Sequence, residues 1–185
     1  MGKNRDSFPL KLARYRALAG RLFIVLAAIL GQATPYSLLA GLFFVCLGEG
    51  LRTAAAGIIK KNETVACTGP YSWCRHPLYL GSFFITLGII LAAGNLFLVI
   101  FGALLFLLFY VSAILVEEKG LCQKFGEAYL RYQQTTPCFL PIIRVSSWQD
   151  FHWTNVWHNR EHINWILLSL LFLWLGVKRW ILPGF

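Results

Sequence analysis

The chain has 185 residues, of which 57% are apolar and only 14% are charged, and its formal net charge is +9. A soluble domain of this size does not need so much apolar surface, so the composition argues against one and predicts a membrane protein with several spanning helices. In such a protein an excess of basic residues reports loop topology and contact with anionic headgroups rather than nucleic-acid binding. The five cysteines form no C-x-x-C pair, which argues against a disulfide framework and against a structural zinc site.

Long apolar segments predict membrane helices at residues 17–30, 36–59, 78–93, 96–116 and 163–180. The predicted fold class is all-α: a polytopic membrane bundle of about five helices with one cytoplasmic amphipathic helix. The amphipathic helix is expected where Leu121, Phe125 and Tyr129 recur every four residues. If the last segment crosses the bilayer, Lys178 and Arg179 lie outside, against the positive-inside rule, so a re-entrant or interfacial placement stays open for it.

Two features of these segments suggest contacts between side chains of the helices. Glu49 and Arg52 are three residues apart and therefore share one face of the second helix, where a structural ion pair near the cytoplasmic edge is favoured over a contact with substrate. Gly81, Gly88 and Gly102 would let the third and fourth helices approach closely, although glycine is also common in membrane helices without such a role.

Basic residues indicate which helix ends face the cytoplasm. The N-terminal tail carries several, and Lys60 and Lys61 follow the second helix. The tail is not followed by a small-residue cleavage pattern, so we expect a cytoplasmic tail rather than a removed signal peptide. An even number of crossings separates Arg75 from the acidic pair Glu117-Glu118, which places these groups on the same cytoplasmic side.

The most informative stretch reads GPYSWCRHPLYLG and covers residues 69–81. Pro77 disfavours helical backbone at His76 and suits the first position of the next helix, so Arg75 and His76 are expected at the mouth of that helix. The free N–H groups and the positive dipole end there favour an anionic group. The antiparallel neighbour ends on two acids, so cations and anions are expected to meet at one membrane face, where they suit a zwitterion with separated charges.

Two other residue patterns give only weak evidence for a binding site. His158 and His162 are four residues apart and could bind a metal, but metal-dependent membrane desaturases need more histidines than the four present here. We therefore expect a solvated interfacial histidine pair and no metal site. The sequence Gly48-Glu49-Gly50 lies inside a helix and lacks the strand–turn–helix setting of a dinucleotide-binding turn.

Several motifs occur in a specific order and spacing. They are GPY at 69–71, RHPLYLG at 75–81, the acids at 117–118, FGEAY at 125–129, Tyr132, Pro137 and Pro141. In this order they resemble the isoprenylcysteine carboxyl methyltransferase superfamily, which includes the membrane phospholipid N-methyltransferases. The similarity extends over residues 65–141, less than half of the chain.

The resemblance implies a multi-pass membrane enzyme that uses S-adenosylmethionine and opens its site to the cytoplasm. The residues expected to bind this cofactor are Tyr71, Arg75, His76, Pro77, Leu78, Tyr79, Gly81, Glu117 and Glu118. The cationic residues and the helix N–H groups would hold the carboxylate of the cofactor, and the two acids its ammonium or ribose hydroxyls. The residues expected to act in catalysis are Arg75, Glu118 and Arg131.

The first expectation for the methyl acceptor is a carboxylate of the prenyl-cysteine type. A carboxylate attacking a sulfonium loses charge in the transition state, so a dry site favours the reaction and no general base is required. The alternative acceptor is the amine of a phospholipid headgroup, which must first lose a proton to a base such as Glu118 or His76. Residues 133–136 lack the basic side chains that carboxyl-methylating members often have before the proline, and Arg131 or Arg144 is a candidate replacement. The acceptor therefore stays open.

Two further classes of protein remain alternatives: an NADPH-dependent membrane reductase of the sterol type, and a non-catalytic membrane scaffold with the same fold. The expected partners are the lipid bilayer and a lipid-like or prenylated substrate, without nucleic acid. Three regions are expected: the tail and first membrane hairpin at 1–64, the cofactor-binding core at 65–141, and a Trp-rich interfacial segment with the last membrane helix at 142–185.

Overall fold

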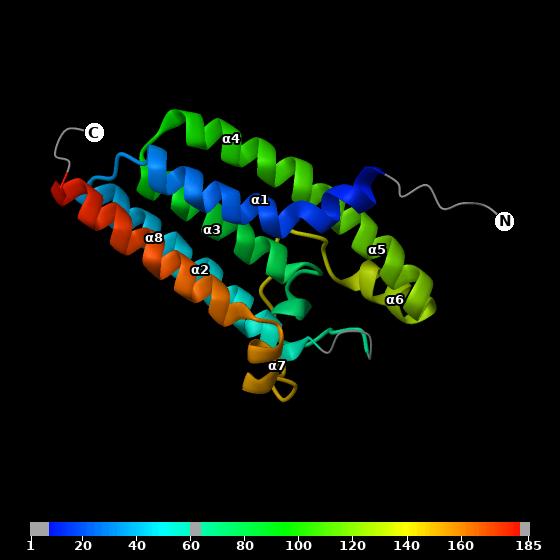
Figure 1. The fold of residues 1–185 in the computed structure, drawn as a ribbon. Coiled ribbons are helices and arrows are strands. Elements are labelled where there is room, and N and C mark those ends of the chain that lie inside the picture. Colours follow the sequence, from blue (N-terminus) through cyan, green and yellow to red (C-terminus); the bar gives the residue numbers. More distant parts are fainter. Residues whose placement is uncertain (1–7, 60–63, 182–185) are drawn as a thin grey trace.

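The computed structural model describes residues 8–59 and 64–181, and every element in this part of the chain is helical. Long helices lie side by side in one bundle, and short ones gather at one end of it (Figure 1). The long helices are α1 (Phe8–Leu30), α2 (Pro35–Ile58), α3 (Pro77–Ala93), α4 (Leu96–Phe106) with η2 (Leu107–Val111) and α5 (Ser112–Phe125), and α8 (Glu161–Ile181). The short ones are η1 (Gly69–Ser72), α6 (Glu127–Thr135) and α7 (Trp153–His158). The all-α prediction is confirmed.

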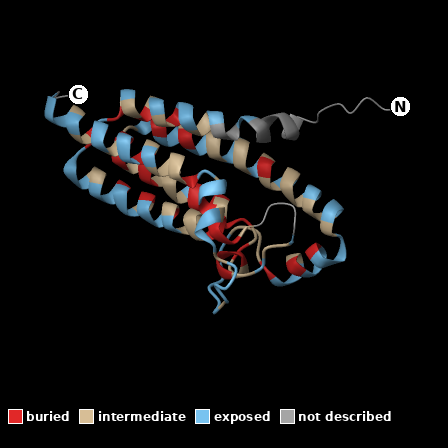
Figure 2. Ribbon diagram, turned by 60° about the horizontal axis from the view of Figure 1, so that its bottom comes forward, coloured by how far each residue is buried: buried red, intermediate tan, exposed pale blue. Residues whose placement is uncertain are grey.

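Three helices in the described residues are long and apolar enough to cross a membrane: Pro35–Ile58, Leu96–Phe125 and Glu161–Ile181. Shorter apolar helices cover Leu18–Leu30 and Pro77–Ala93. Figure 2 shows exposed residues along the outward faces of the long helices, and many of them are large and apolar. An apolar outer surface of this kind is suited to contact with lipid, because the hydrocarbon core of a bilayer solvates apolar side chains and water does not.

The last helix is longer than the sequence predicts and is fixed at its far end. Lys178 donates hydrogen bonds to the carbonyls of Ile29 and Gly31 at 2.6 and 2.9 Å, and Arg179 donates to the carbonyl of Ala33 at 3.2 Å. These carbonyls lie in the last turn of α1 and in the linker that follows it, where backbone oxygens lack helical partners. Of the two basic residues that conflict with the charge rule, Lys178 therefore caps α1 and Arg179 holds the linker.

Local sequence signals mark the starts of α2 and α3, which lie at opposite ends of the bundle because the two helices are antiparallel. Thr34 forms a capping box with Ser37 ahead of α2, and Pro35 occupies the first turn. His76 is the N-cap residue of α3 and Pro77 follows it in the first turn, as predicted. At the other end of α3, Gly94 adopts φ 60°, a left-handed conformation that ends the helix.

The glycines of α3 pack against α2 rather than against the next helix. A Cβ at Gly48 would lie 2.5 Å from the carbonyl oxygen of Gly81, and one at Gly41 would lie 2.5 Å from that of Gly88. The prediction that Gly81 and Gly88 pack against the fourth helix is wrong, because their bare faces meet the glycines of α2. Gly102 does face α3, since its Cβ would lie 2.9 Å from Ile90.

The fourth membrane helix runs well past the acidic pair. The stretch Leu96–Phe125 is helical throughout, with the π-helical turn η2 in the middle, so Glu117 and Glu118 lie inside α5 instead of at a helix end. The helix breaks at Gly126, which adopts φ 51° and ψ −126°, a conformation open mainly to glycine. The single amphipathic helix of the sequence prediction is therefore the end of α5 plus the separate α6.

Candidate functional site

The 69–81 motif is held in place by a second segment far along the chain. The Arg75 N–H donates to the carbonyl of Pro137 at 2.8 Å, and the Ile142 N–H donates to the carbonyl of Trp73 at 3.0 Å. The Tyr132 hydroxyl adds a 2.6 Å bond to the carbonyl of Tyr71. Tyr132, Pro137 and Ile142 of this later segment thus frame the backbone that presents Arg75 and His76.

Arg75 connects three segments of the site. Its Nε and Nη2 lie 2.8 and 2.6 Å from Oε1 of Glu118, and its Nη1 donates to the carbonyls of Gln133 and Thr136 at 3.1 and 3.0 Å. Burial acts to lower the pKa of Arg75, but the hydrogen bond and charge of Glu118 outweigh it and raise that pKa. The start of α3, α5 and α6 are therefore joined through one guanidinium.

His76 and Tyr79 bring the same acidic pair to the mouth of α3. Nε2 of His76 lies 3.2 Å from Oε1 of Glu118, and the Tyr79 hydroxyl donates to Oε2 of Glu117 at 2.5 Å. The imidazole and the Tyr79 ring stack with their centroids 5.5 Å apart. Burial lowers the pKa of His76 despite the opposing charges of Glu117 and Glu118, so the imidazole is neutral near pH 7. Predicted cations and acids do meet at one end of the bundle.

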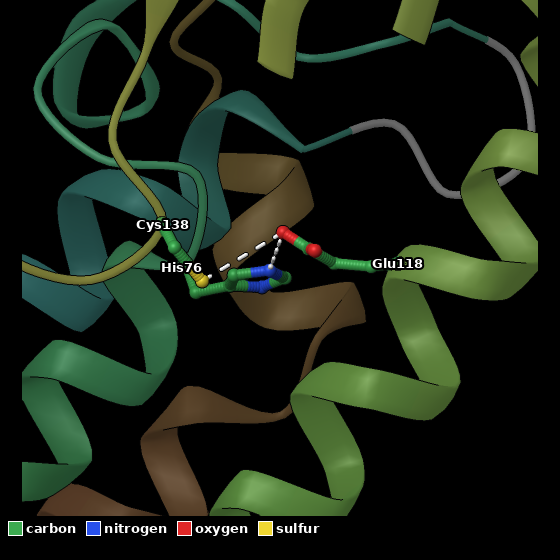
Figure 3. Close-up of side chains that lie close together, drawn as sticks. All are labelled: His76, Glu118 and Cys138. Carbon is green, nitrogen blue, oxygen red and sulfur yellow. Dashed lines mark hydrogen bonds and ion pairs between the residues drawn. The ribbon is translucent and has the colours of Figure 1, made fainter. Parts of the chain in front are cut away.

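Cys138 completes a compact group with His76 and Glu118 (Figure 3). Their potential ligand atoms lie within 4.8 Å of one another, a spacing that could hold a metal ion. Arg75 already donates twice to the same Glu118 oxygen, and a metal there would sit beside its guanidinium. Burial and the charge of Glu118 also raise the pKa of the Cys138 thiol, which disfavours the thiolate that a metal needs. These contacts favour a charge pair over a metal centre.

A cavity of about 760 Å³ extends from this group into the bundle. Of the residues predicted to bind cofactor, its walls contain Tyr71, Arg75, His76, Pro77, Leu78, Tyr79 and Glu117. Three predicted site residues are placed elsewhere. Glu118 lies against Arg75 and His76 without lining the cavity, Gly81 faces α2, and Arg131 is exposed on α6.

The cavity also has an apolar part between the long helices. Its lining residues there include Phe23 and Ile24 of α1, Ile85 and Ile89 of α3, and Leu167 and Leu168 of α8. One end is therefore polar and the other suits a hydrocarbon chain, which is the division that an amphipathic ligand requires.

A second charged group lies in the wall of this cavity. Arg52 donates to both carboxylate oxygens of Glu161, at 3.0 and 2.8 Å, and its Nη1 donates to the Ser82 hydroxyl at 2.6 Å. The predicted pair of Glu49 with Arg52 is therefore wrong: the guanidinium turns to α8, where Glu161 offers a bidentate contact.

Some buried polar atoms in the cavity wall have no hydrogen-bond partner among the described residues. They are the hydroxyls of Tyr71 and Tyr129, both carboxylate oxygens of Glu49 and Oδ1 of Asn159. Burial raises the pKa of Tyr71, so its hydroxyl keeps its proton and is a donor for a ligand. Because buried polar groups are nearly always paired, these atoms are candidates for contact with a bound molecule.

Sequence reasoning missed part of this site. It places Tyr129 only on the apolar face of a surface helix, and it gives Tyr110 and Glu161 no role, yet all three line the cavity. The available signal for Tyr129 is its place in the FGEAY motif. Glu161 has none, because its partner Arg52 is 109 residues away in the sequence.

His158 and His162 are placed away from the charged group at the start of α3. His158 is exposed, while Nδ1 of His162 is buried without a hydrogen-bond partner among the described residues and its ring lies 4.8 Å from that of Trp157. The prediction of two solvated histidines therefore holds for His158 but not for His162.

Comparison with known proteins gives matches to methyltransferases. The residue pattern of the phospholipid methyltransferase family matches residues 15–128. Protein-S-isoprenylcysteine O-methyltransferase of Mus musculus is 34% identical over 116 residues, which are 56% of this chain and 41% of the mouse protein. The protein of that name from Schizosaccharomyces pombe is 30% identical over 56% of this chain and 49% of its own length.

A bacterial relative of another name also matches. The cobalt-zinc-cadmium resistance protein CzcN of Cupriavidus metallidurans is 33% identical over 137 residues, 67% of this chain and 63% of that protein. The chain thus spans between 41% and 63% of the length of these curated relatives. No solved structure matches.

Proposed function

The chain belongs to the phospholipid methyltransferase family, and on that basis we propose that it is a membrane methyltransferase that uses S-adenosylmethionine and acts on an amphipathic, lipid-like acceptor. The observation that carries the proposal is the cavity itself. It joins Arg75, His76 and Glu117 at its polar end to an apolar part between α1, α3 and α8. A charged cofactor and a lipid chain would each find a matching end.

The residues at the polar end fit the charges of the proposed cofactor. The contacts from described residues use four of the five N–H donors of Arg75, which leaves one for the carboxylate of the cofactor. In the first turn of α3 the N–H of Leu78 can join it, because Pro77 has none and the N–H groups of Tyr79 and Leu80 donate to the carbonyl of His76. Glu117 is placed to hold an ammonium, and the unpaired hydroxyls of Tyr71 and Tyr129 suit a ribose or a carboxylate. When bound, S-adenosylmethionine supplies a methyl group carried on a positively charged sulfur.

Glu118 acts in this proposal through Arg75 and His76 rather than by direct contact. It accepts hydrogen bonds from Arg75 and lies against His76, so it fixes both side chains at the mouth of α3. The predicted catalytic role of Arg131 is not retained, because its side chain is exposed and outside the cavity lining.

The favoured acceptor is a carboxylate of the prenyl-cysteine type. The relatives named protein-S-isoprenylcysteine O-methyltransferase support this choice, and the apolar walls suit a prenyl chain. Enclosure away from water favours a reaction in which opposite charges cancel. The second candidate, the amine of a phospholipid headgroup, is supported by the family description and by the unpaired carboxylate of Glu49 in the cavity wall.

The test uses the detergent-solubilised full chain with methyl-labelled S-adenosylmethionine and three acceptors: a prenyl-cysteine analogue, phosphatidylethanolamine and a total lipid extract. Label on the prenyl-cysteine carboxylate is the expected result, and label on the phospholipid amine would select the second candidate. Binding of S-adenosylhomocysteine and of NADPH is measured in parallel. Absence of methyl transfer to every acceptor, with no binding of S-adenosylhomocysteine, would contradict the proposal.

A further inference from the structure

Glu49 is an acidic residue inside an apolar helix and has no described hydrogen-bond partner. It lies within Pro35–Ile58, one of the helices able to cross a membrane, and it lines the cavity. Both carboxylate oxygens are buried, and neither has a hydrogen bond of ordinary geometry among the described residues, although the indole of Trp165 lies within weak hydrogen-bonding reach of the side chain. Acidic groups at such positions are costly, and they commonly mark a pathway or a ligand site.

The guanidinium of Arg52, one turn from Glu49, is already bonded to other groups. Arg52 gives Nε and Nη2 to Glu161 and Nη1 to Ser82 and to the carbonyl of Leu78. Glu161 also accepts a bond from Asn164 at 3.1 Å. The cluster therefore contains two acids and one base, and the base neutralises Glu161. The formal excess of negative charge rests on Glu49.

Glu49 shares the cavity with the groups proposed to bind the cofactor. Tyr79 and Glu117 line the same cavity, and Ser82, which bonds Arg52, is one helical turn beyond Tyr79 on α3. A ligand that extends from the cofactor end into the apolar part passes along this wall. A buried carboxylate there favours an N–H donor, because the donor supplies a hydrogen bond and, where it is a protonated amine, positive charge as well.

We propose that Glu49 binds an N–H group on the methyl acceptor, so that the accepted substrates are amphiphiles with an amine or amide nitrogen near the methylated group. That the ligand is the methyl acceptor rests on the proposed function, but its binding to Glu49 can be measured without methyl transfer. It covers both candidate acceptors: the α-nitrogen of a prenylated cysteine and the amine of a phospholipid headgroup. The two sources are separated in the experiment.

The experiment measures equilibrium binding to the detergent-solubilised full chain by calorimetry. Three farnesyl thioethers share one carboxylate and carry an amino group, an acetylamino group or a hydrogen at the α-carbon. Short-chain phosphatidylethanolamine and phosphatidylcholine form the second arm, because only the first has N–H donors. The variants are Glu49→Gln, which removes the charge, and Glu49→Leu, which also removes the acceptor. Glu127→Gln is the matched control, since Glu127 is exposed on α6.

The wild type is expected to bind the amino thioether at least about tenfold more tightly than the nitrogen-free one, the size of one charge-assisted hydrogen bond. Glu49→Gln should remove most of that preference for the amine, and Glu49→Leu should remove it for the amide as well. Binding of the nitrogen-free thioether and of S-adenosylhomocysteine should stay unchanged in all variants. Preference for phosphatidylethanolamine over the thioethers would assign the N–H group to a lipid headgroup.

Equal binding of the three thioethers by the wild type, together with no preference between the two phospholipids, would overturn the inference, and Glu49 would then be a buried carboxyl without a ligand role. An equal loss for all ligands in the Glu49 variants would also overturn it, because that pattern reports a structural defect. Retained N–H preference in a protein that transfers no methyl group would leave this inference standing and contradict only the proposed function.

Discussion

Arg75 shows how a single side chain organises the candidate site. Its guanidinium holds Glu118 on α5 and two carbonyls at the end of α6, so the start of α3 is fixed against both helices. A lysine at this position could not make these forked contacts. Arg75 and Glu118, which sequence reasoning assigns to a ligand, thus first neutralise one another, and of the acidic pair Glu117 is the residue that lines the cavity.

Glu117 is the residue whose charge is expected to matter most for cofactor affinity. We predict that Glu117→Gln weakens binding of S-adenosylhomocysteine by about tenfold, or about 1.4 kcal/mol, because the ammonium of the ligand loses a charged partner. Tyr79 can still donate to the glutamine oxygen, so the fold should be preserved. Calorimetry on the solubilised protein measures the change, with Glu127→Gln as control. Unchanged affinity would remove Glu117 from the cofactor site.

His76 should make the stability of the protein depend on pH. Burial lowers the pKa of His76 below its ordinary value of 6.5, so below that pH the unfolded chain binds a proton that the folded chain resists. We therefore predict that stability falls as the pH drops from about 6.5, and that His76→Gln falls less steeply. The charged and titratable groups facing His76 are Arg75, Tyr79, Glu117, Glu118 and Cys138, and they are common to both proteins.

Thermal unfolding of the two proteins between pH 5 and pH 8 measures this effect. The difference between their unfolding curves isolates His76, because the other groups titrate in both. A wild type that gains stability relative to His76→Gln on acidification would mean that the imidazole is held as a cation by the two acids, opposite to the prediction.

At the scale of elements, the contact between α2 and α3 depends on backbone proximity. A Cβ at Gly48 would meet the carbonyl oxygen of Gly81 at 2.5 Å, whereas a Cβ at Gly50, on the same helix, would have nothing within 4 Å. This matched pair separates helix propensity from packing, since both substitutions add one methyl group to one helix.

We predict that Gly48→Ala destabilises the protein by about 1–3 kcal/mol, because the two helices must move apart. Gly50→Ala should be neutral or stabilise by up to about 1 kcal/mol, because alanine is the better helix former. Thermal unfolding in detergent measures both. Equal effects of the two substitutions would show that the close approach of α2 and α3 is not maintained in solution.

Local signals predicted the starts of α2 and α3 but not their partners. Pro77 acts on the backbone beside it, so the sequence predicted the proline-led first turn, whereas the capping box of Thr34 with Ser37 is a finding of the structure. The side on which Gly81 packs and the partner of Arg52 depend on how distant segments assemble. The end of the fourth helix was placed too early because two acids resemble a helix end, whereas Gly126 supplies the actual break.

At the scale of the whole molecule, α8 belongs to the candidate site although it lies outside residues 15–128 that match the family. Glu161 binds Arg52 at one end of α8, and Lys178 caps α1 at the other. Leu167 and Leu168, between them, line the cavity. The sequence predicted an apolar helix here, but its role as a cavity wall follows only from contacts that span the chain.

The two ends of the bundle give a direct test of membrane orientation. Gln149 lies near the 69–81 motif, since Ser147 and Asp150 contact Gly69 and Thr68. Gln32 lies at the other end, where its N–H bonds the carbonyl of Ala93. Both glutamines are exposed. Replacing each by cysteine, in a chain whose native cysteines have been replaced, therefore places one thiol at each end.

We predict that an impermeant maleimide labels Gln32→Cys in intact cells and labels Gln149→Cys only after the membrane is opened. The reason is the positive-inside rule, because Lys60, Lys61 and the basic N-terminal tail belong by sequence to the end that carries the motif. Binding of S-adenosylhomocysteine checks that each cysteine-substituted chain remains folded. The reverse labelling pattern would place the cavity mouth outside the cell, away from the cytoplasmic supply of the cofactor that the site is proposed to use.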